Sequence, residues 1–520
     1  MKKIIAFFTL VLFAQLGQAQ NLNFTADNVK DSTVYLARYY GPKLYYADTT
    51  VVKNGKFSFD GSKQEAGLFA VIMPNGKYFE MIIDGEDVDM HIKDPENFIG
   101  GMTVNKSVNN KVFYNYIKFM QKNKEQGSAL NEKYTKAAEG SDEKAAIRKE
   151  MVALNEKVAE YQKKLVAENP KRFIGVMVKM SIDIELPEPP KDANGVITDS
   201  NFVYHYYVDH YWDNVDFSDP RIVKAPIFHN KLDKFFSKRV LIQIPDSIAV
   251  HAKKLIDKTD QLDQSNKVFQ YIVHHVTNKY ETSQIMGMDK VFCFMAQNYY
   301  CPPNNLAYWV TEENTTKICE RAEKVCRTSP GSFAPMLILP DTSDVNWINS
   351  HSFDSDYTVI YFWDPTCGHC KKVTPKLQTL YDKKFKERNV EIYAVAKATG
   401  DDFEKWKKFI RDHELTFTNV GLTKSVYDEA TENPTNLLRN KTNIQSLNYA
   451  DTYDVYSTPR IYIIDKNKNI LFKQISIGQL EEIIDDKTGH RDDVKLFPVE
   501  NPENGEQAPD EHDEHDGHDH

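Results

Sequence analysis

The sequence predicts a multidomain protein with an N-terminal antiparallel β-sandwich-like domain, a central α-helical region and a C-terminal α/β domain. Three observations predict this order. At 520 residues the chain is long enough for two or three domains. Short apolar runs separated by Asn-Gly and Asp-Gly turns come first, helical periodicity follows, and apolar strands then alternate with helices. We expect the domains at residues 20–108, 109–327 and 328–490, with a disordered acidic tail at 491–520.

The composition is that of a folded protein with real hydrophobic cores. Hydrophobic residues make up 41% of the chain and aromatic residues 12%. The mean hydropathy of -0.55 argues against a protein that crosses a membrane many times. A formal net charge of -10 gives no indication of nucleic-acid binding, so no nucleic-acid partner is predicted.

Residues 1–19 have the pattern of a cleavable export signal. Two lysines follow Met1, Ile4–Ala14 form an apolar core, and Gly17–Ala19 offer a small-x-small cleavage site. The apolar run is too short for a stable membrane anchor, so the protein should not span a membrane after cleavage. We expect the mature chain to start near Gln20 in the periplasm, which is oxidising. A buried N-terminal helix is the alternative.

The β-rich segment and the helical region after it offer few chemical groups in a catalytic pattern. The β-rich segment is interpreted as a docking or spacer module. In the helical region, apolar residues from Ile147 to Leu165 recur with a heptad-like spacing that begins after Ser141. His205, Asp209 and His210 raise a metal hypothesis. The alternative is a core helix in which the neighbouring Tyr and Trp residues provide packing.

Four cysteines lie near the end of the helical region. Cys319 and Cys326 are seven residues apart on one predicted helix, about 10 Å, which forbids a direct bond. Across an antiparallel helical hairpin, the spacings would pair Cys301 with Cys319 and Cys293 with Cys326. Buried free thiols are the alternative.

The most informative stretch is a strand followed by a CxxC motif. Val359–Trp363 has the length and the β-branched and aromatic content of a buried strand, and Asp-Pro-Thr ends it. Cys367-Gly-His-Cys370 then opens a helical pattern. Two intervening residues let one helical turn bring the sulfurs into disulfide range, and the N–H groups at the helix start stabilise a thiolate on Cys367.

This stretch and its downstream partners resemble thioredoxin-fold proteins of the TlpA/ResA branch. The resemblance covers roughly residues 328–486 and implies an α/β thioredoxin fold. The two segments before it resemble domains of unknown function that precede thioredoxin domains in exported proteins of the Bacteroidetes type. Four features carry the thioredoxin resemblance: Trp363 before the Cys pair, Pro375 five residues after it, Gly331–Pro335 at the start, and Tyr456–Pro459 before Ile461–Asp465.

The resemblance implies a role for each site residue. Cys367 is the nucleophile, Cys370 resolves the mixed disulfide, and a cationic His369 between them favours the thiolate. Thr458 and Pro459 should form a cis-proline loop that faces the pair and binds an extended substrate segment. Trp363 is assigned to the substrate-binding side of the site, with core packing as the alternative.

One position departs from the thioredoxin pattern. Thioredoxins carry a buried acid two residues before the Trp of this strand, and here that position is Tyr361. The proton acceptor for Cys370 is therefore left open. The Gly-His pair between the cysteines resembles protein disulfide isomerase and points to an oxidising couple, whereas the TlpA/ResA frame points to a reductase.

The predicted function is a periplasmic thiol–disulfide oxidoreductase, with reduction favoured. Its implied partners are protein disulfides and a membrane thiol reductant, and no cofactor is predicted. One alternative is a disulfide isomerase or oxidase. A peroxide-reducing enzyme fits poorly because Pro365-Thr366-Cys367 lacks the spacing of a peroxidatic cysteine. A binding module with a structural or metal-loaded CxxC is the last alternative.

The acidic tail is a weak metal candidate. It contains His512, His515, His518 and His520 among aspartate and glutamate. Imidazole and carboxylate ligands favour zinc, nickel or copper. A solvated tail without fixed geometry is the preferred interpretation, so no metal site is predicted.

Overall fold

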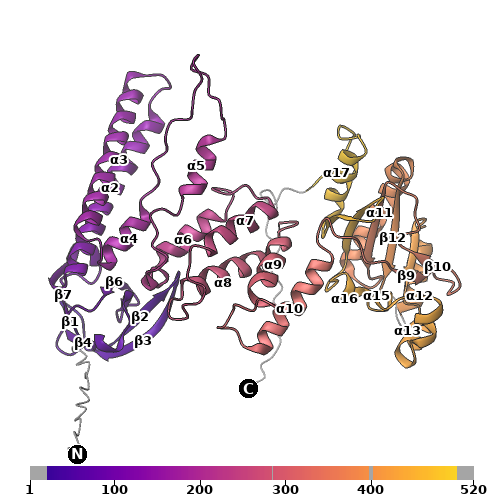
Figure 1. Cartoon of the computed structure of the whole chain (residues 1–520), viewed down its shortest axis with the longest axis horizontal. Helices are drawn as coiled ribbons and strands as arrows, with labels where there is room; N and C mark the ends of the chain where they lie inside the picture. The colour runs from indigo at the N-terminus through magenta and orange to yellow at the C-terminus, as the bar shows by residue number, and fades with distance from the viewer. Residues whose placement is uncertain (1–19, 284, 398–401, 500–520) are drawn as a thin grey trace, which may run out of the picture. The chain divides into compact units, whose positions relative to one another are not determined.

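The computed structural model describes residues 20–283, 285–397 and 402–499 (Figure 1). The predicted export signal and the four histidines of the tail lie outside the described residues. The chain divides into two compact units. The first holds the chain up to Gln243 together with Val250–His274, and the second holds Ile244–Ala249 and the chain from His275 onward. Two helices, α7 (Pro245–Ile256) and α8 (Val268–Glu281), have residues in both units.

Two four-stranded sheets build the β-rich part of the first unit, and the prediction that this part is antiparallel is wrong for one strand pair. One has the strand order β4-β1-β7-β8 and the other β3-β2-β5-β6. The pairing of β1 with β7 is parallel and the other pairs are antiparallel, so one sheet is mixed. The strands are β1 (Asn21–Ala26), β2 (Thr33–Tyr40), β3 (Lys43–Val51), β4 (Lys56–Asp60), β5 (Gly67–Ile72), β6 (Tyr78–Ile83), β7 (Val88–Ile92) and β8 (Met102–Lys106).

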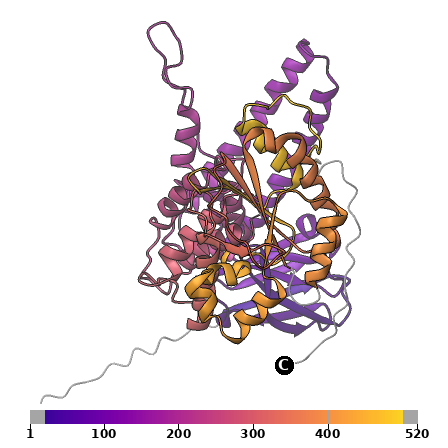
Figure 2. The ribbon, with the colours of Figure 1, turned by 90° about the vertical axis from the view of Figure 1, so that its right-hand side faces the viewer.

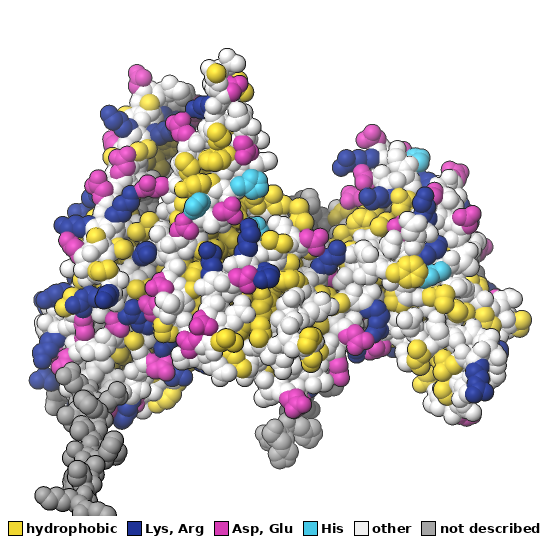
Figure 3. All heavy atoms as spheres, in the orientation of Figure 1, with side chains coloured by type: hydrophobic (Ala, Val, Ile, Leu, Met, Phe, Trp, Pro, Cys, Tyr) yellow, Lys and Arg dark blue, Asp and Glu magenta, His cyan; other side chains and the backbone are white. Residues whose placement is uncertain are grey.

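Helices complete the first unit, and the two longest lie side by side (Figures 1 and 2). Ser141 caps α3 by accepting a hydrogen bond from the backbone N–H of Lys144, as its position before the helical pattern predicts. Tyr161 of α3 stacks on Phe119 of α2 with ring centroids 4.0 Å apart. Figure 3 shows acidic and basic side chains interspersed along this pair. The helices are α1 (Phe98–Gly101), α2 (Val108–Lys136), α3 (Asp142–Glu168), α4 (Phe173–Ser181), α5 (Phe202–His210) and α6 (Pro226–Phe235).

The second unit begins with a helical hairpin that two disulfides close. Helix α9 (Asp289–Met295) continues into a π-helical turn, and α10 (Glu312–Arg327) returns beside it. The bonds join Cys301 to Cys319 and Cys293 to Cys326, which confirms the predicted nested pairing.

A five-stranded sheet forms the centre of the second unit, in the order β13-β12-β11-β14-β15. Strands β11, β12 and β13 are parallel, and β14 runs antiparallel to both β11 and β15. Strand β15 is therefore parallel to β11, so the carboxyl ends of both strands point the same way along the sheet. A two-stranded ribbon of β9 and β10 precedes it. The strands are β9 (Ile338–Pro340), β10 (Trp347–Asn349), β11 (Tyr357–Trp363), β12 (Val390–Ala396), β13 (Thr418–Gly421), β14 (Arg460–Asp465) and β15 (Ile470–Lys473).

Helices cover both faces of this sheet, as Figure 2 shows. One buried cluster includes residues of α11, α12 and α17, and the other includes residues of α13, α14 and α16. The polar segment at residues 422–447 folds into short helices that help to cover one face. The helices are α11 (Gly368–Leu380), α12 (Asp402–Asp412), α13 (Lys424–Glu432), α14 (Thr435–Asn440), α15 (Ile444–Leu447), α16 (Tyr449–Thr452) and α17 (Ile477–Lys487).

Helix length and polarity bear on membrane insertion. Across the described residues, every helix is too short or too polar to cross a bilayer.

Candidate active site

The end of strand β11 and the start of helix α11 position the two cysteines of the CxxC motif. Strand β11 is buried along nearly its whole length and ends at Trp363. The carboxylate of Asp364 then accepts hydrogen bonds from the backbone N–H and the hydroxyl of Thr366, at 2.7 and 2.6 Å, which fixes the turn. Cys367 is the N-cap residue of α11, and Cys370 lies one turn further along the helix.

The two thiols differ in exposure and in acidity. Cys367 is partly exposed, whereas Cys370 is fully buried. Hydrogen bonds from the backbone N–H of Cys370, and then of His369, lower the pKa of Cys367 below its ordinary value of 9.0. Burial raises the pKa of Cys370 to about 11, even though the backbone N–H of Asp364 lies 3.5 Å from its sulfur. At neutral pH, Cys367 is therefore the more nucleophilic thiol.

The loop before β14 faces the more acidic cysteine. The Thr458–Pro459 peptide bond is cis, as predicted. The thiol of Cys367 donates a hydrogen bond to the carbonyl oxygen of Thr458, with 3.5 Å between sulfur and oxygen. Arg460 pairs with Phe362 in the sheet, so the start of β14 lies beside the end of β11. The structure thus brings together Cys367, Cys370, Thr458 and Pro459, although their chemical roles stay predictions.

Trp363 and His369 occupy opposite environments. The Trp363 side chain is 0% exposed and belongs to the buried cluster that contains Cys370, and the Phe409 ring packs against it at a tilt, with 5.2 Å between ring centroids. This burial favours the packing alternative over direct contact with a substrate. His369 is exposed, and its backbone N–H is the part that hydrogen-bonds to the Cys367 sulfur. Whether its imidazole supports the thiolate stays a prediction.

A hydroxyl pair occupies the position where thioredoxins carry a buried acid. The Tyr361 hydroxyl lies 2.8 Å from the Thr374 hydroxyl, and both side chains are buried. Burial raises the pKa of Tyr361 well above its ordinary value, so its phenol stays protonated at neutral pH. Tyr361 can therefore hydrogen-bond near the dithiol but is no general base. Thr374 was not predicted, and its position four residues after Cys370 on the same helix face is the signal that identifies it.

Two metal hypotheses from the sequence concern the CxxC motif and the residues His205, Asp209 and His210 of α5, and neither group forms a three-ligand site among the described residues. Among the described residues, no third cysteine, histidine or carboxylate lies in ligating range of the two sulfurs. His205, Asp209 and His210 lie on α5 without forming a three-ligand group in the described chain, and His210 bonds to Asp213 at 2.7 Å. The neighbouring Trp212 is buried, as the packing alternative predicts.

Three family models match consecutive segments of the chain. Residues 330–473 match the AhpC/TSA family, residues 153–328 match a domain of unknown function (DUF5106), and residues 21–134 match another (DUF4369). No curated protein matches the chain.

Solved structures with which the chain shares similarity include three from bacteria. A thioredoxin-like protein from Bacteroides caccae is 17% identical over 58% of this chain and 97% of its own, with a TM-score of 0.39. A domain of a possible thiol-disulfide isomerase from Cytophaga hutchinsonii is 29% identical over 31% and 93%, with a TM-score of 0.24. The thioredoxin domain of a thiol-disulfide oxidoreductase from Bacteroides vulgatus is 23% identical over 31% and 98%, with a TM-score of 0.25.

The family matches agree with the order of parts predicted from the sequence. The AhpC/TSA match includes the strand, the CxxC motif and the cis-proline loop of the site described above. The C-terminal part of the chain therefore has a thioredoxin-like α/β fold and matches the AhpC/TSA family, and the two segments before it match domains of unknown function.

Proposed function

We propose that the chain is a periplasmic thiol–disulfide oxidoreductase that reduces protein disulfides through Cys367 and Cys370. One observation carries the proposal: the helix start holds an accessible thiol of lowered pKa next to a buried thiol whose pKa is about 11. Such a pair separates the attacking group from the resolving group.

In the first step, the Cys367 thiolate attacks one sulfur of a substrate disulfide. A new bond forms between the Cys367 sulfur and that substrate sulfur, while the substrate disulfide breaks and its second sulfur leaves as a thiolate that takes a proton. The carbonyl oxygen of Thr458 lies 3.5 Å from the Cys367 sulfur, and this proximity supports pairing of the Thr458 backbone with an extended substrate segment during the attack.

In the second step, Cys370 resolves the mixed disulfide. Its thiol gives up a proton to solvent or to the leaving sulfur and attacks the Cys367 sulfur. The bond to the substrate breaks, a disulfide between Cys367 and Cys370 forms, and the substrate leaves with both sulfurs reduced. Two electrons pass from the protein to the substrate, and a membrane thiol donor would return them.

The direction of the reaction depends on how strongly the reduced form is stabilised. Strong oxidants of this class owe their high potential to a very stable thiolate. Here the hydrogen bonds that lower the pKa of Cys367 come from backbone N–H groups and neutral side chains. Because these donors are uncharged, we favour a reductase over an isomerase or oxidase.

The test compares two serine variants of the full-length chain in the reduction of a protein disulfide, with a dithiol as electron donor. Cys367→Ser should abolish turnover, because it removes the attacking sulfur. Cys370→Ser is the matched control in the same helix: it should keep the attack and accumulate a mixed disulfide visible by mass. Unchanged turnover in Cys367→Ser would overturn the proposal.

The predicted export signal at residues 1–19 supports the periplasmic location. If the location is right, protein purified from the native envelope should begin near Gln20, as N-terminal sequencing would show. A chain that retains Met1 in the cytoplasmic fraction would contradict it.

A further inference from the structure

The disulfide-closed hairpin of α9 and α10 contacts the segment that leads into the cis-proline loop. Arg321 of α10 pairs with the carboxylate of Asp454, with 2.5 Å between nitrogen and oxygen. The Asp454 side chain is only 4% exposed, whereas that of Arg321 is 34% exposed, so the carboxylate end of the ion pair is buried and the guanidinium end still reaches water. One turn along the same helix, Lys324 pairs with Asp451 at 2.5 Å.

The ion pair with Arg321 holds Asp454, a residue whose backbone conformation is uncommon. Its φ of 55° lies in the left-handed region, which non-glycine residues occupy mainly where neighbouring groups hold them. The next residues run directly to Thr458, whose carbonyl oxygen contacts the Cys367 thiol. The conformation at Asp454 therefore helps to set where Thr458 lies.

The same guanidinium also contacts the exposed part of this segment. Arg321 lies over the ring of Tyr456, 5.4 Å from its centroid. The Tyr456 side chain is 71% exposed and lies two residues before Thr458. Arg321 thus joins a buried carboxylate to an exposed aromatic ring two residues before Thr458, and its guanidinium helps to orient that ring.

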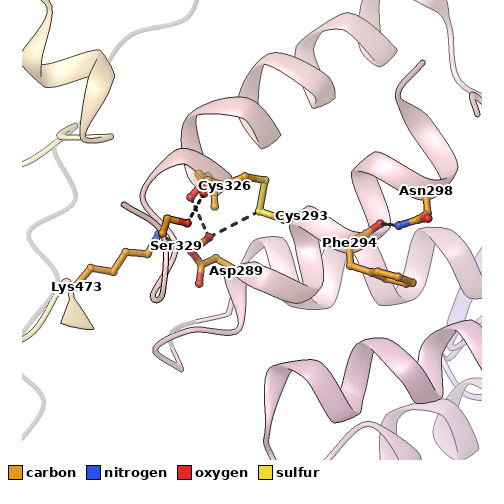
Figure 4. Close-up of a disulfide and its surroundings, with 9 residues drawn as sticks. Asp289, Cys293, Phe294, Asn298, Cys326, Ser329 and Lys473 are labelled. Atoms are coloured by element: carbon orange, nitrogen blue, oxygen red, sulfur yellow. Dashed lines mark hydrogen bonds and ion pairs between the residues drawn. A yellow bond between two sulfur atoms is a disulfide. The ribbon is translucent and has the colours of Figure 1, made fainter. Parts of the chain in front are cut away.

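A second anchor fixes the hairpin to the sheet, as Figure 4 shows. Asp289 of α9 forms an ion pair with Lys473, the last residue of β15, and accepts a hydrogen bond from the Ser329 hydroxyl at 3.0 Å. Asp289 begins the helix that carries Cys293, which is bonded to Cys326 of α10. The hairpin is therefore held both at β15 and at the segment before β14.

We propose that this hairpin is a positioning element of the dithiol site, and that Arg321 determines specificity for extended protein substrates. Arg321 holds the segment 454–458 so that Thr458 and the Tyr456 ring meet a substrate backbone in register with the Cys367 sulfur. Small disulfides need only the sulfur and do not use this surface. The inference rests on the proposed function and assigns a role to the last part of the DUF5106 match.

The experiment measures two substrates with the full-length chain. Arg321→Ala should lower kcat/KM for a protein disulfide by about tenfold, mainly through KM, because a misplaced binding surface loses contacts that the bound substrate and the transition state share. Its rate with a small aromatic disulfide and the reduction potential of the Cys pair should stay within twofold of the wild type. Arg327→Ala is the matched control, since Arg327 lies on the same helix and pairs there with Glu323.

Two further variants keep the inference testable if Arg321→Ala folds poorly. Tyr456→Ala removes an exposed ring and should show the same selective loss with an unchanged thermal midpoint. Arg321→Lys keeps a charge for Asp454 and should recover part of the loss. Wild-type KM for the protein substrate in both Arg321→Ala and Tyr456→Ala would overturn the inference, as would an equal loss with the small disulfide. In either case the proposed function would stand, whereas a wild-type chain inactive with both substrates would overturn the proposed function itself.

Discussion

The contrast between the two thiols predicts selective alkylation of the reduced protein at neutral pH. A thiol reacts with iodoacetamide as its thiolate, so the labelling rate follows the ionised fraction. Cys367 has a pKa below 9.0, whereas that of Cys370 is about 11. Because the thiolate fraction increases as the pH rises through the pKa, Cys367 should label first at every pH below about 9.

The size of the preference can be worked from these pKa values. At pH 7 a thiol with a pKa of about 11 is ionised in about 1 molecule in 10,000, and one with a pKa of 9.0 in about 1 in 100. The lower intrinsic nucleophilicity of the more acidic thiolate offsets this hundredfold ratio by about eightfold. Cys367 should therefore label at least about tenfold faster than Cys370, and the full burial of Cys370 increases the ratio.

The assay reduces the full-length protein mildly, adds iodoacetamide for a short time, quenches with acid and quantifies each labelled peptide by mass spectrometry. The structural disulfides serve as internal controls, because their cysteines should remain unlabelled. Equal labelling of the two thiols, or faster labelling of Cys370, would refute the assignment of Cys367 as nucleophile.

Two further predictions concern stability. Tyr361→Phe leaves the buried Thr374 hydroxyl without its partner and should lower the free energy of unfolding by about 1 to 3 kcal/mol, measured by urea titration; no change would mean that the hydroxyl pair contributes nothing. Asp485→Asn removes a carboxylate of 0% exposure that accepts hydrogen bonds from two lysines and an arginine, and should cost about 3 kcal/mol. Burial would raise the pKa of Asp485, but these hydrogen bonds lower it, so its contribution should be complete above about pH 4 and lost as the pH falls further. Parallel pH profiles of variant and wild type would contradict this.

Local patterns in the sequence were sufficient to predict much of the candidate active site. The strand, turn and helix of the site are contiguous in the sequence as an apolar run, an Asp-Pro-Thr break and a CxxC motif. Their geometry therefore follows from the spacing of apolar residues and from the residues that favour a turn. The nested disulfide pairing could also be predicted from the sequence, because the spacing of cysteines along a helix limits which of them can meet. The structure confirms both.

Long-range contacts could not be predicted in this way. Nothing in the sequence near Arg321 indicates that it pairs with Asp454, because the two residues meet only when the hairpin packs beside the sheet. The parallel pairing of β1 with β7 depends likewise on which strands become neighbours, which alternation alone does not determine. Trp363 was placed at the substrate side by its position in the motif, but the packing of α12 covers it.

The reduction potential of the Cys367–Cys370 couple distinguishes a disulfide reductase from an isomerase or oxidase. Full-length protein would be equilibrated across a range of dithiol–disulfide buffers, and the oxidised fraction of this pair quantified by alkylation and mass spectrometry. We predict a reversible two-electron couple near about -270 mV, as in thioredoxin. A value between about -180 and -120 mV would contradict the proposed reductase, and failure of the two thiols to form a disulfide at any potential would contradict the dithiol mechanism altogether.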